Sequence, residues 1–137
     1  MKSIFIFLIA FSSTLIYSQK TSTSIQVSVN NVPGSDGTVQ FGLYSKDNFM
    51  VAPPLQSATG KIEASKTTVT FNNVAPGEYA VLCYYDKNDN KQMDFEENGM
   101  PTESYGASNN IMSMGPPQWS DAKFEVKEAP IMLEIRL

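Results

Sequence analysis

The sequence predicts an all-β fold, a single antiparallel β-sandwich of about seven to eight strands. Three observations lead to this prediction. Several short runs alternate apolar and polar side chains, which is the period-two pattern of a strand with one buried face. Clusters of Gly, Pro, Asn and Asp separate these runs, as turns would. Beyond the N-terminal apolar segment, no stretch shows the helical repeat of an amphipathic helix.

The first two strands are expected at residues 24–32 and 38–45. In both, valine, isoleucine, leucine or phenylalanine alternates with polar residues, so one face of each strand is expected to be buried. The segment 33–37 between them reads Pro-Gly-Ser-Asp-Gly and has the composition of a tight turn. The two strands are therefore predicted to form a β-hairpin.

Two shorter strands are expected at residues 60–64 and 67–72, with Val69 and Phe71 on the buried face of the second. They follow a loop at 46–57, where two consecutive prolines argue against a central strand and several apolar residues give the loop an anchor.

Residues 78–85 form the most apolar strand of the domain, entered through a Pro-Gly turn. Apolar or aromatic side chains fall on both of its faces, so both are expected to be covered, as in the middle of a sandwich. Cys83 is accordingly expected to be a small buried hydrophobe rather than a nucleophile. A long, mostly irregular loop at 98–118 follows, and strands at 122–127 and 131–137 close the domain.

The N-terminus has the layout of a secretory signal peptide. Lys2 precedes an apolar segment at 4–11, small and polar residues follow, and Ser18 stands at the expected cut. The apolar stretch is shorter than the roughly 20 residues of a membrane span, and a retained anchoring helix is the alternative. The predicted organisation is a signal peptide at 1–18 and one β-sandwich domain at 19–137, with no membrane span in the mature chain. The protein is expected to be exported to the periplasm, the cell surface or the medium.

Charge and residue types exclude several classes of function. The chain has 10 basic and 14 acidic residues, and without Lys2 the mature chain keeps 9 basic residues against 14 acidic ones, a net charge of −5. Nucleic acid is therefore not an expected partner. The chain has no histidine and one cysteine, which excludes Ser-His-Asp and Cys-His catalysis, histidine-ligated zinc and an intrachain disulfide. A non-catalytic protein is expected.

The polar stretch 86–97 follows directly on the apolar strand and carries the sharpest chemical signal. Oxygen-bearing side chains stand at its positions 1, 3, 5, 9 and 12, the spacing with which an EF-hand-type loop surrounds a calcium ion. The predicted calcium ligands are the side chains of Asp86, Asn88, Asn90, Asp94 and Glu97 and the backbone carbonyl of Gln92. Glu103 and Glu96 are within reach of a folded-back loop as alternatives to Glu97 for the closing carboxylate. A solvated acidic turn without an ion is the competing interpretation.

Two features distinguish this stretch from an EF-hand. Position 6 is Lys91, where the helix-loop-helix version has glycine, so a non-glycine residue must adopt that turn conformation or the loop must be wider. The preceding element is a strand and not a helix. The prediction is an EF-hand-like loop on a β-domain, with few charged ligands, as is typical of weak extracellular calcium sites.

An ordered series of motifs resembles the DUF2141 family, small exported bacterial proteins of unknown function. The matching segments are Pro-Gly-Glu-Tyr-Ala-Val at 76–81, Tyr-Asp-Lys-Asn-Asp-Asn at 85–90, Met-Asp at 93–94, Gly-Met-Pro-Thr-Glu at 99–103, Tyr-Gly-Ala-Ser-Asn at 105–109, Pro-Pro at 116–117 and Asp-Ala at 121–122. The family pattern often has His and Gly where Tyr85 and Lys91 stand. It features a glutamate at the position of Glu103 more than one at Glu97, which implies Glu103 as an outer or closing ligand.

The Pro-Gly-x-Tyr entry into an apolar strand is also similar to that of transthyretin-like and carboxypeptidase-regulatory sandwiches. This resemblance implies an immunoglobulin/transthyretin-like sandwich and carries no function with it.

Three functions are compatible with these features. The first is recognition, in which the calcium-ordered loop supports residues 98–119 as a surface for an envelope or extracellular protein, a peptide or a glycan, with Trp119 as an anchor or as a plug of the sandwich. The second is a purely structural domain in which the ion only pins the loop. The third is a hydrolase that uses Asp94 with Glu97 or Glu103 as general acid and base. Recognition is the prediction, since the sequence has no recognisable catalytic constellation.

Overall fold

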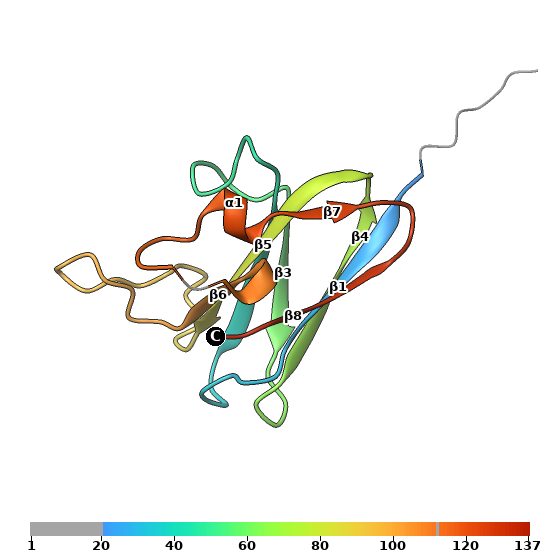
Figure 1. The fold of residues 1–137 in the computed structure, drawn as a ribbon. Coiled ribbons are helices and arrows are strands. Elements are labelled where there is room, and N and C mark those ends of the chain that lie inside the picture. Colours follow the sequence, from blue (N-terminus) through green and yellow to red (C-terminus); the bar gives the residue numbers. More distant parts are fainter. Residues whose placement is uncertain (1–20, 112) are drawn as a thin grey trace, which may run out of the picture.

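The computed structural model describes residues 21–111 and 113–137, which form two β-sheets packed on one another (Figure 1). The strands are β1 (Thr23–Val29), β2 (Thr38–Tyr44), β3 (Gln56–Lys61), β4 (Thr67–Val74), β5 (Gly77–Asp86), β6 (Tyr105–Ala107), β7 (Phe124–Val126) and β8 (Ile131–Ile135), with a 3₁₀ turn η1 (Ser108–Asn110) and a one-turn helix α1 (Trp119–Ala122). The predicted all-β sandwich is confirmed. The expected signal peptide at 1–18 lies outside the described residues.

The two sheets differ in size and in strand direction. One has three strands in the order β4-β1-β8, and the other has β3-β2-β5-β6, with β7 paired to the beginning of β5. Every pair is antiparallel except β1 with β8, which run parallel from Ile25↔Ile131 to Val29↔Ile135. The expectation of a purely antiparallel sandwich is wrong at this pair. The chain reaches β8 from β7 in the opposite sheet, so no hairpin turn sets the direction of β8.

The predicted hairpin of the first two strands is also wrong, because β1 and β2 lie in different sheets. The segment 30–37 is instead an arch that crosses from one sheet to the other. Val32 in this arch is 3% exposed, and its N–H donates to the carbonyl of Ser65 at 3.0 Å. The alternation of side chains predicted correctly which face of each strand is buried, but it holds no information about the partner strand.

The strand predicted at 60–64 begins and ends earlier in the structure, at Gln56–Lys61 (β3), because a turn occupies the residues before β4. Ala64 and Ser65 form the turn with φ of 51° and 62°, and Glu63 and Lys66 exchange backbone hydrogen bonds of 2.9 and 3.0 Å across it. Neither turn residue is glycine or asparagine, so the usual signal of such a turn is missing from the sequence.

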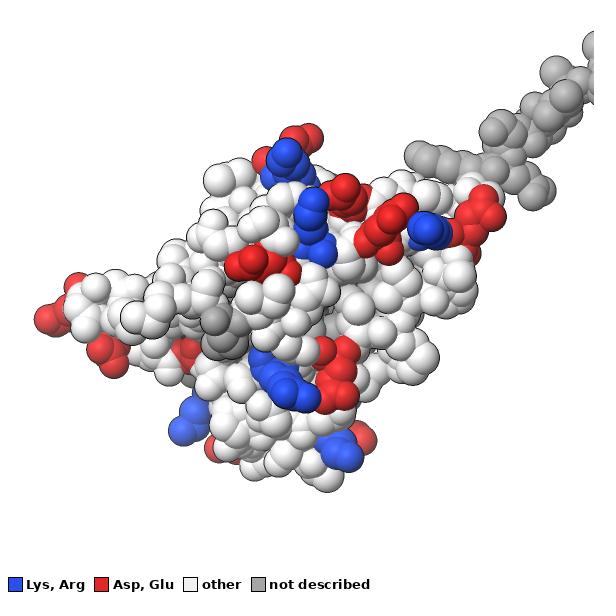
Figure 2. All heavy atoms as spheres, in the orientation of Figure 1, with Lys and Arg blue, Asp and Glu red and all other residues white. Residues whose placement is uncertain are grey.

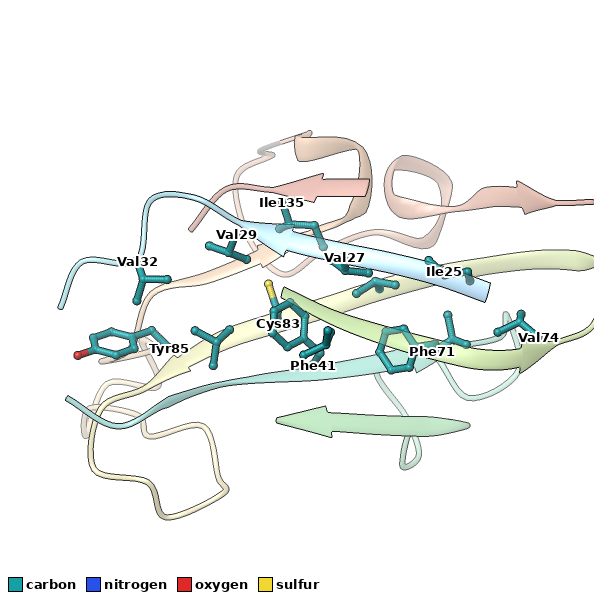
Figure 3. Packing of buried hydrophobic residues seen from close by; sticks show 14 of the residues in the cluster. Ile25, Val27, Val29, Val32, Phe41, Phe71, Val74, Cys83, Tyr85 and Ile135 are labelled. Atoms are coloured by element: carbon teal, nitrogen blue, oxygen red, sulfur yellow. The ribbon is translucent and has the colours of Figure 1, made fainter. Parts of the chain in front are cut away.

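The sandwich interior is a continuous apolar cluster formed by both sheets (Figure 3). Ile25, Val27 and Val29 of β1 face Phe41 of β2 and Cys83 of β5, all of them buried. Cys83 is 2% exposed, and burial raises the pKa of its thiol to about 12, against a smaller lowering effect of a backbone hydrogen bond from Gly106. The prediction that this cysteine is a buried hydrophobe is confirmed.

The outer face of β5 is covered by a second apolar cluster, so the expectation that both faces are covered is also confirmed. Phe49 from the 46–55 loop and Ala122 from α1 are buried here against Ala80 of β5. The ring of Trp119 packs edge-on against Phe49, with ring centroids 5.6 Å apart. This packing favours a structural role for Trp119 over a role as a ligand-binding anchor. The tryptophan covers the outer face of the sheet, however, and does not close the end of the sandwich as expected.

Among the described residues, no helix has the length and apolar character required to cross a membrane.

Candidate functional site

The polar loop begins where β5 ends, at a buried aspartate. Asp86 is the last residue of β5, pairs with Thr38 of β2 and is 0% exposed. Its Oδ1 accepts the N–H of Asn90 at 3.1 Å and its Oδ2 accepts the N–H of Lys91 at 2.9 Å. These two bonds curl the chain back over the carboxylate, as position 1 of a calcium loop requires.

Two non-glycine residues adopt left-handed backbone conformations to make this curl. Asp89 has φ of 53° and Lys91 has φ of 63°. Lys91 therefore takes the conformation expected at the sixth position in the absence of glycine. The Lys91 Nζ lies 2.6 Å from Asp89 Oδ1, which also accepts the hydroxyl of Thr38 at 2.9 Å. The hydrogen bonds from Lys91 and then Thr38 hold the pKa of the Asp89 carboxyl below its usual range.

Three of the predicted ligands converge within this loop. The amide of Asn88 donates to Asp94 Oδ2 at 2.8 Å, and the amide of Asn90 donates to Asp94 Oδ1 at 2.9 Å. The Oδ1 atom of Asn90 accepts the N–H of Gln92 at 3.0 Å. A half-turn about the last side-chain bond exchanges the nitrogen and oxygen of an asparagine amide, so Asn88 and Asn90 can present either atom to the space near Asp94.

The two candidates for the closing carboxylate occupy different places. Glu103 is half-buried, and its Oε2 accepts the N–H of Asp94 at 3.1 Å. Burial, followed by the negative charges of Asp94 and Asp86, raises the pKa of the Glu103 carboxyl, against hydrogen bonds from backbone groups that lower it. Glu97 is exposed. The geometry places Glu103, and not Glu97, against the loop.

Glu97 lies on a projecting arm formed by residues 95–101. The arm is closed by a bridge between Phe95 and Pro101 and by a hydrogen bond of 2.7 Å from the N–H of Glu96 to the carbonyl of Met100. Acidic side chains gather at the tip of the molecule at the left in Figure 2. Both glutamates of the arm are exposed, and Gln92 is exposed in the loop before it.

No three Asp, Glu, His or Cys side chains form a metal-holding group within residues 21–111 and 113–137. An ion in this loop would therefore depend on the amide oxygens of Asn88 and Asn90 and on the backbone carbonyl of Gln92, in addition to carboxylates. Calcium accepts such neutral oxygens readily, whereas a site for a softer metal would need histidine or cysteine.

A cleft of about 770 Å³ lies beside the loop. The arch before β2 forms one wall, and the loop with the strand entry at 102–104 forms the other. Its lining residues are Pro33, Gly34, Ser35, Asp36, Tyr85, Lys87, Asn88, Asp94, Thr102, Glu103 and Ser104. The sequence predicts a binding surface at 98–119 but not the arch, because residues 33–37 have the composition of a hairpin turn.

Tyr85 is the other residue that sequence reasoning did not assign to the site. The alternation along 78–85 placed it on the inner face of the strand, and it is indeed 6% exposed. Its hydroxyl has no hydrogen-bond partner. The sequence does hold one indication of this role. Tyr85 is the last inward-facing residue before the polar loop, and a buried tyrosine hydroxyl usually finds a polar partner at the edge of the core.

Fold and loop together define a small all-β sandwich protein with an Asp/Asn-rich loop at the end of its central strand. The chain belongs to the family described as uncharacterized protein conserved in bacteria (DUF2141), whose model matches residues 27–133. No curated protein and no solved structure shows a significant match to the chain.

Proposed function

We propose that this protein is an exported, non-catalytic binding module in which a calcium ion, held by the loop 86–97 and Glu103, orders a binding surface for an envelope or extracellular partner or glycan. The observation that supports the proposal best is the curl of the loop around Asp86. A buried carboxylate that accepts two successive backbone N–H groups, with two non-glycine residues in left-handed conformations, is a costly backbone arrangement for a solvated turn.

The donors near the loop suit calcium in number and in charge. Asp86, Asn88, Asn90, Asp94 and Glu103 can each contribute one side-chain oxygen, and the carbonyl of Gln92 adds a sixth. Calcium takes about six to eight oxygens. Asp86 Oδ2 accepts the N–H of Lys91 and, at 3.5 Å, the amide of Gln40, whereas Oδ1 accepts only the N–H of Asn90 and retains a lone pair for ligation. Asp86, Asp94 and Glu103 do not form a metal-holding group as they stand in the described residues, so ion binding would have to draw these carboxylates together. The affinity expected is therefore that of a weak extracellular module, with Kd of about 10⁻⁴–10⁻³ M.

A purely structural domain is the second candidate, and one observation favours it. Asp94 already accepts hydrogen bonds from the amides of Asn88 and Asn90, so the loop is closed without an ion. In the calcium-bound loop these amides would turn their oxygens inward and Asp94 would exchange the amide hydrogen bonds for the cation. The two candidates therefore differ in whether calcium stabilises the fold.

Thermal unfolding in a calcium titration tests the proposal. Calcium at about a hundredfold excess over Kd is expected to add about 2.7 kcal/mol to the stability, a rise in Tm of roughly 10 °C for a domain of this size. Asp94→Asn keeps a hydrogen-bonding group of the same size and is expected to remove this rise. Glu96→Gln makes the same change of charge on the exposed arm and serves as the control.

Magnesium at the same concentration separates a calcium site from general screening of negative charge. Magnesium is expected to have little effect, because it demands octahedral geometry and gives up its water reluctantly. A Tm that does not change at about 10–100 mM calcium, which is a hundredfold excess over the expected Kd, would refute the calcium site and leave the structural domain as the better account.

A further inference from the structure

We propose that the cleft between the arch 33–36 and the loop is the binding site for a neutral, hydroxyl-rich ligand such as an oligosaccharide, with the hydroxyl of Tyr85 as a contact reserved for that ligand. The inference rests on the proposed function, whose unspecified binding surface it assigns to this cleft. Its volume of about 770 Å³ is within the range of small-ligand sites.

The hydroxyl of Tyr85 is the first observation that indicates a ligand. Tyr85 stands at the end of the apolar core beside Val32, with its hydroxyl directed away from the other core side chains (Figure 3). The residue is 6% exposed, lines the cleft and leaves this hydroxyl without a hydrogen-bond partner. A buried unpaired hydroxyl costs about 1–3 kcal/mol, whereas phenylalanine would fill the same space without that cost.

Gly34 in the arch makes the close approach to Tyr85 possible. A Cβ at this position would collide with the Tyr85 hydroxyl oxygen. The arch thus packs directly over the hydroxyl, and both belong to the lining of the cleft. The hydroxyl atom itself is covered by the arch, so a ligand oxygen would supply the missing hydrogen bond by displacing the arch at Gly34.

The lining favours a ligand that carries many O–H groups. Asp36, Asp94 and Glu103 offer carboxylate oxygens, which only accept hydrogen bonds, and Lys87 offers an ammonium group, which only donates. Serine, threonine and asparagine side chains also line the cleft and can both donate and accept, beside Pro33, Gly34 and Tyr85. Hydroxyl groups of a saccharide donate and accept at once, so a single ligand can satisfy both kinds of partner.

The charge of the cleft selects against an anionic ligand. Three carboxylates and one ammonium give the lining a formal charge of −2. A calcium ion in the adjacent loop offsets this charge, which leaves a nearly neutral cleft for a neutral ligand. An acidic ligand would still meet Asp36, which lies on the opposite wall from the loop.

The proposed calcium site and the cleft have three residues in common. Asn88, Asp94 and Glu103 belong both to the loop cluster and to the lining of the cleft. The protein supplies about six oxygens to a calcium ion that can accept up to about eight, so one or two positions are open on this side for ligand hydroxyls. Saccharide binding is accordingly expected to depend on calcium.

An array of soluble neutral and acidic oligosaccharides, probed with the full chain lacking residues 1–18 in about 1 mM calcium, tests the inference. The neutral saccharide that binds most tightly is then titrated by calorimetry against two variants. Tyr85→Phe removes only the unpaired hydroxyl and is expected to weaken binding about tenfold without lowering the Tm. The matched control is Tyr79→Phe on the same strand, whose hydroxyl donates to the carbonyl of Ala75 at 2.8 Å. This control is expected to lower the Tm and leave the affinity unchanged.

Several results would overturn the inference: no neutral saccharide retained on the array, retention of acidic saccharides alone, or equal affinity for the wild type and Tyr85→Phe. The calcium-dependent rise in Tm is measured for the same samples, so the two proposals fail separately. A rise without saccharide binding contradicts the cleft assignment and leaves the calcium loop standing. Saccharide binding that Tyr85→Phe weakens, without any rise, supports the cleft and contradicts the calcium loop.

Discussion

Replacement of Glu103 by glutamine is expected to have opposite effects on stability with and without calcium. Glu103 is half-buried next to Asp94, and burial together with the charges of Asp94 and Asp86 raises its pKa. A raised pKa means that the fold accommodates the neutral carboxyl better than the carboxylate. This contribution to stability is present below the usual value of 4.5 and is lost as the pH rises through the folded-state pKa.

In calcium-free buffer at neutral pH, Glu103→Gln is therefore expected to stabilise the fold. Glutamine retains an oxygen that can accept the N–H of Asp94, now bonded to Glu103 Oε2 at 3.1 Å, and it removes the repulsion. Because solvent screens this partly exposed group, the gain is expected to be below about 1 kcal/mol, or roughly 4 °C in Tm. The difference between variant and wild type should shrink as the pH falls below about 4.5.

With calcium, the same substitution removes a ligand or a group that supports one. The affinity for calcium is expected to fall at least about tenfold, equivalent to about 1.4 kcal/mol. Differential scanning fluorimetry with chelator and with millimolar calcium gives both comparisons. Glu97→Gln makes the same change of charge on the exposed arm and is expected to change neither Tm by more than a degree or so. If Glu97→Gln weakens the calcium response and Glu103→Gln does not, the assignment of the closing carboxylate is wrong.

Three further substitutions or modifications test the fold around the site. Ser108→Ala is expected to cost about 1–3 kcal/mol in a denaturant titration, because the buried Ser108 hydroxyl accepts the N–H of Val81 at 3.0 Å and donates to the carbonyl of Ala122. A cost below about 1 kcal/mol would contradict this role. Gly106→Ala is expected to cost about 1–3 kcal/mol, since the new Cβ would collide with the carbonyl of Arg136. An unchanged Tm would show that β6 and the residue after β8 are not so close. Cys83, with a pKa of about 12, is expected to resist alkylation at pH 8 until the protein unfolds, and complete labelling of the native protein by mass spectrometry would disprove its burial.

The fold class could be predicted because it depends on local patterns. The alternation of apolar and polar residues in β1 and β2 indicates which side chains are buried. In β5, apolar side chains on both faces indicate that both faces of the strand are covered. The partner of each strand could not be predicted in the same way. Whether the segment 30–37 turns back within a sheet or arches to the other sheet depends on tertiary packing, here on Val32 in the core.

For the candidate site too, the local features could be predicted from the sequence and the long-range ones could not. The spacing of Asp86, Asn88, Asn90 and Asp94 is local, and the structure brings these residues together as the spacing predicts. The position of Glu103 depends on how the chain returns to the sheet after the arm. The sequence alone left Glu103 open beside Glu97 and Glu96, and the family resemblance favoured it. The cleft depends on a wall from a part of the chain some fifty residues away, which no local motif can indicate.

A crystal structure of the domain grown with calcium, with anomalous diffraction recorded from the ion, would show whether the loop holds calcium. We expect an anomalous peak inside the loop, with oxygens of Asp86, Asn88, Asn90, Asp94 and Glu103 and the carbonyl of Gln92 at about 2.3–2.6 Å. We also expect the two asparagine amides to turn their oxygens towards the ion. A loop without a peak, in which both amides still donate to Asp94, would contradict the calcium site.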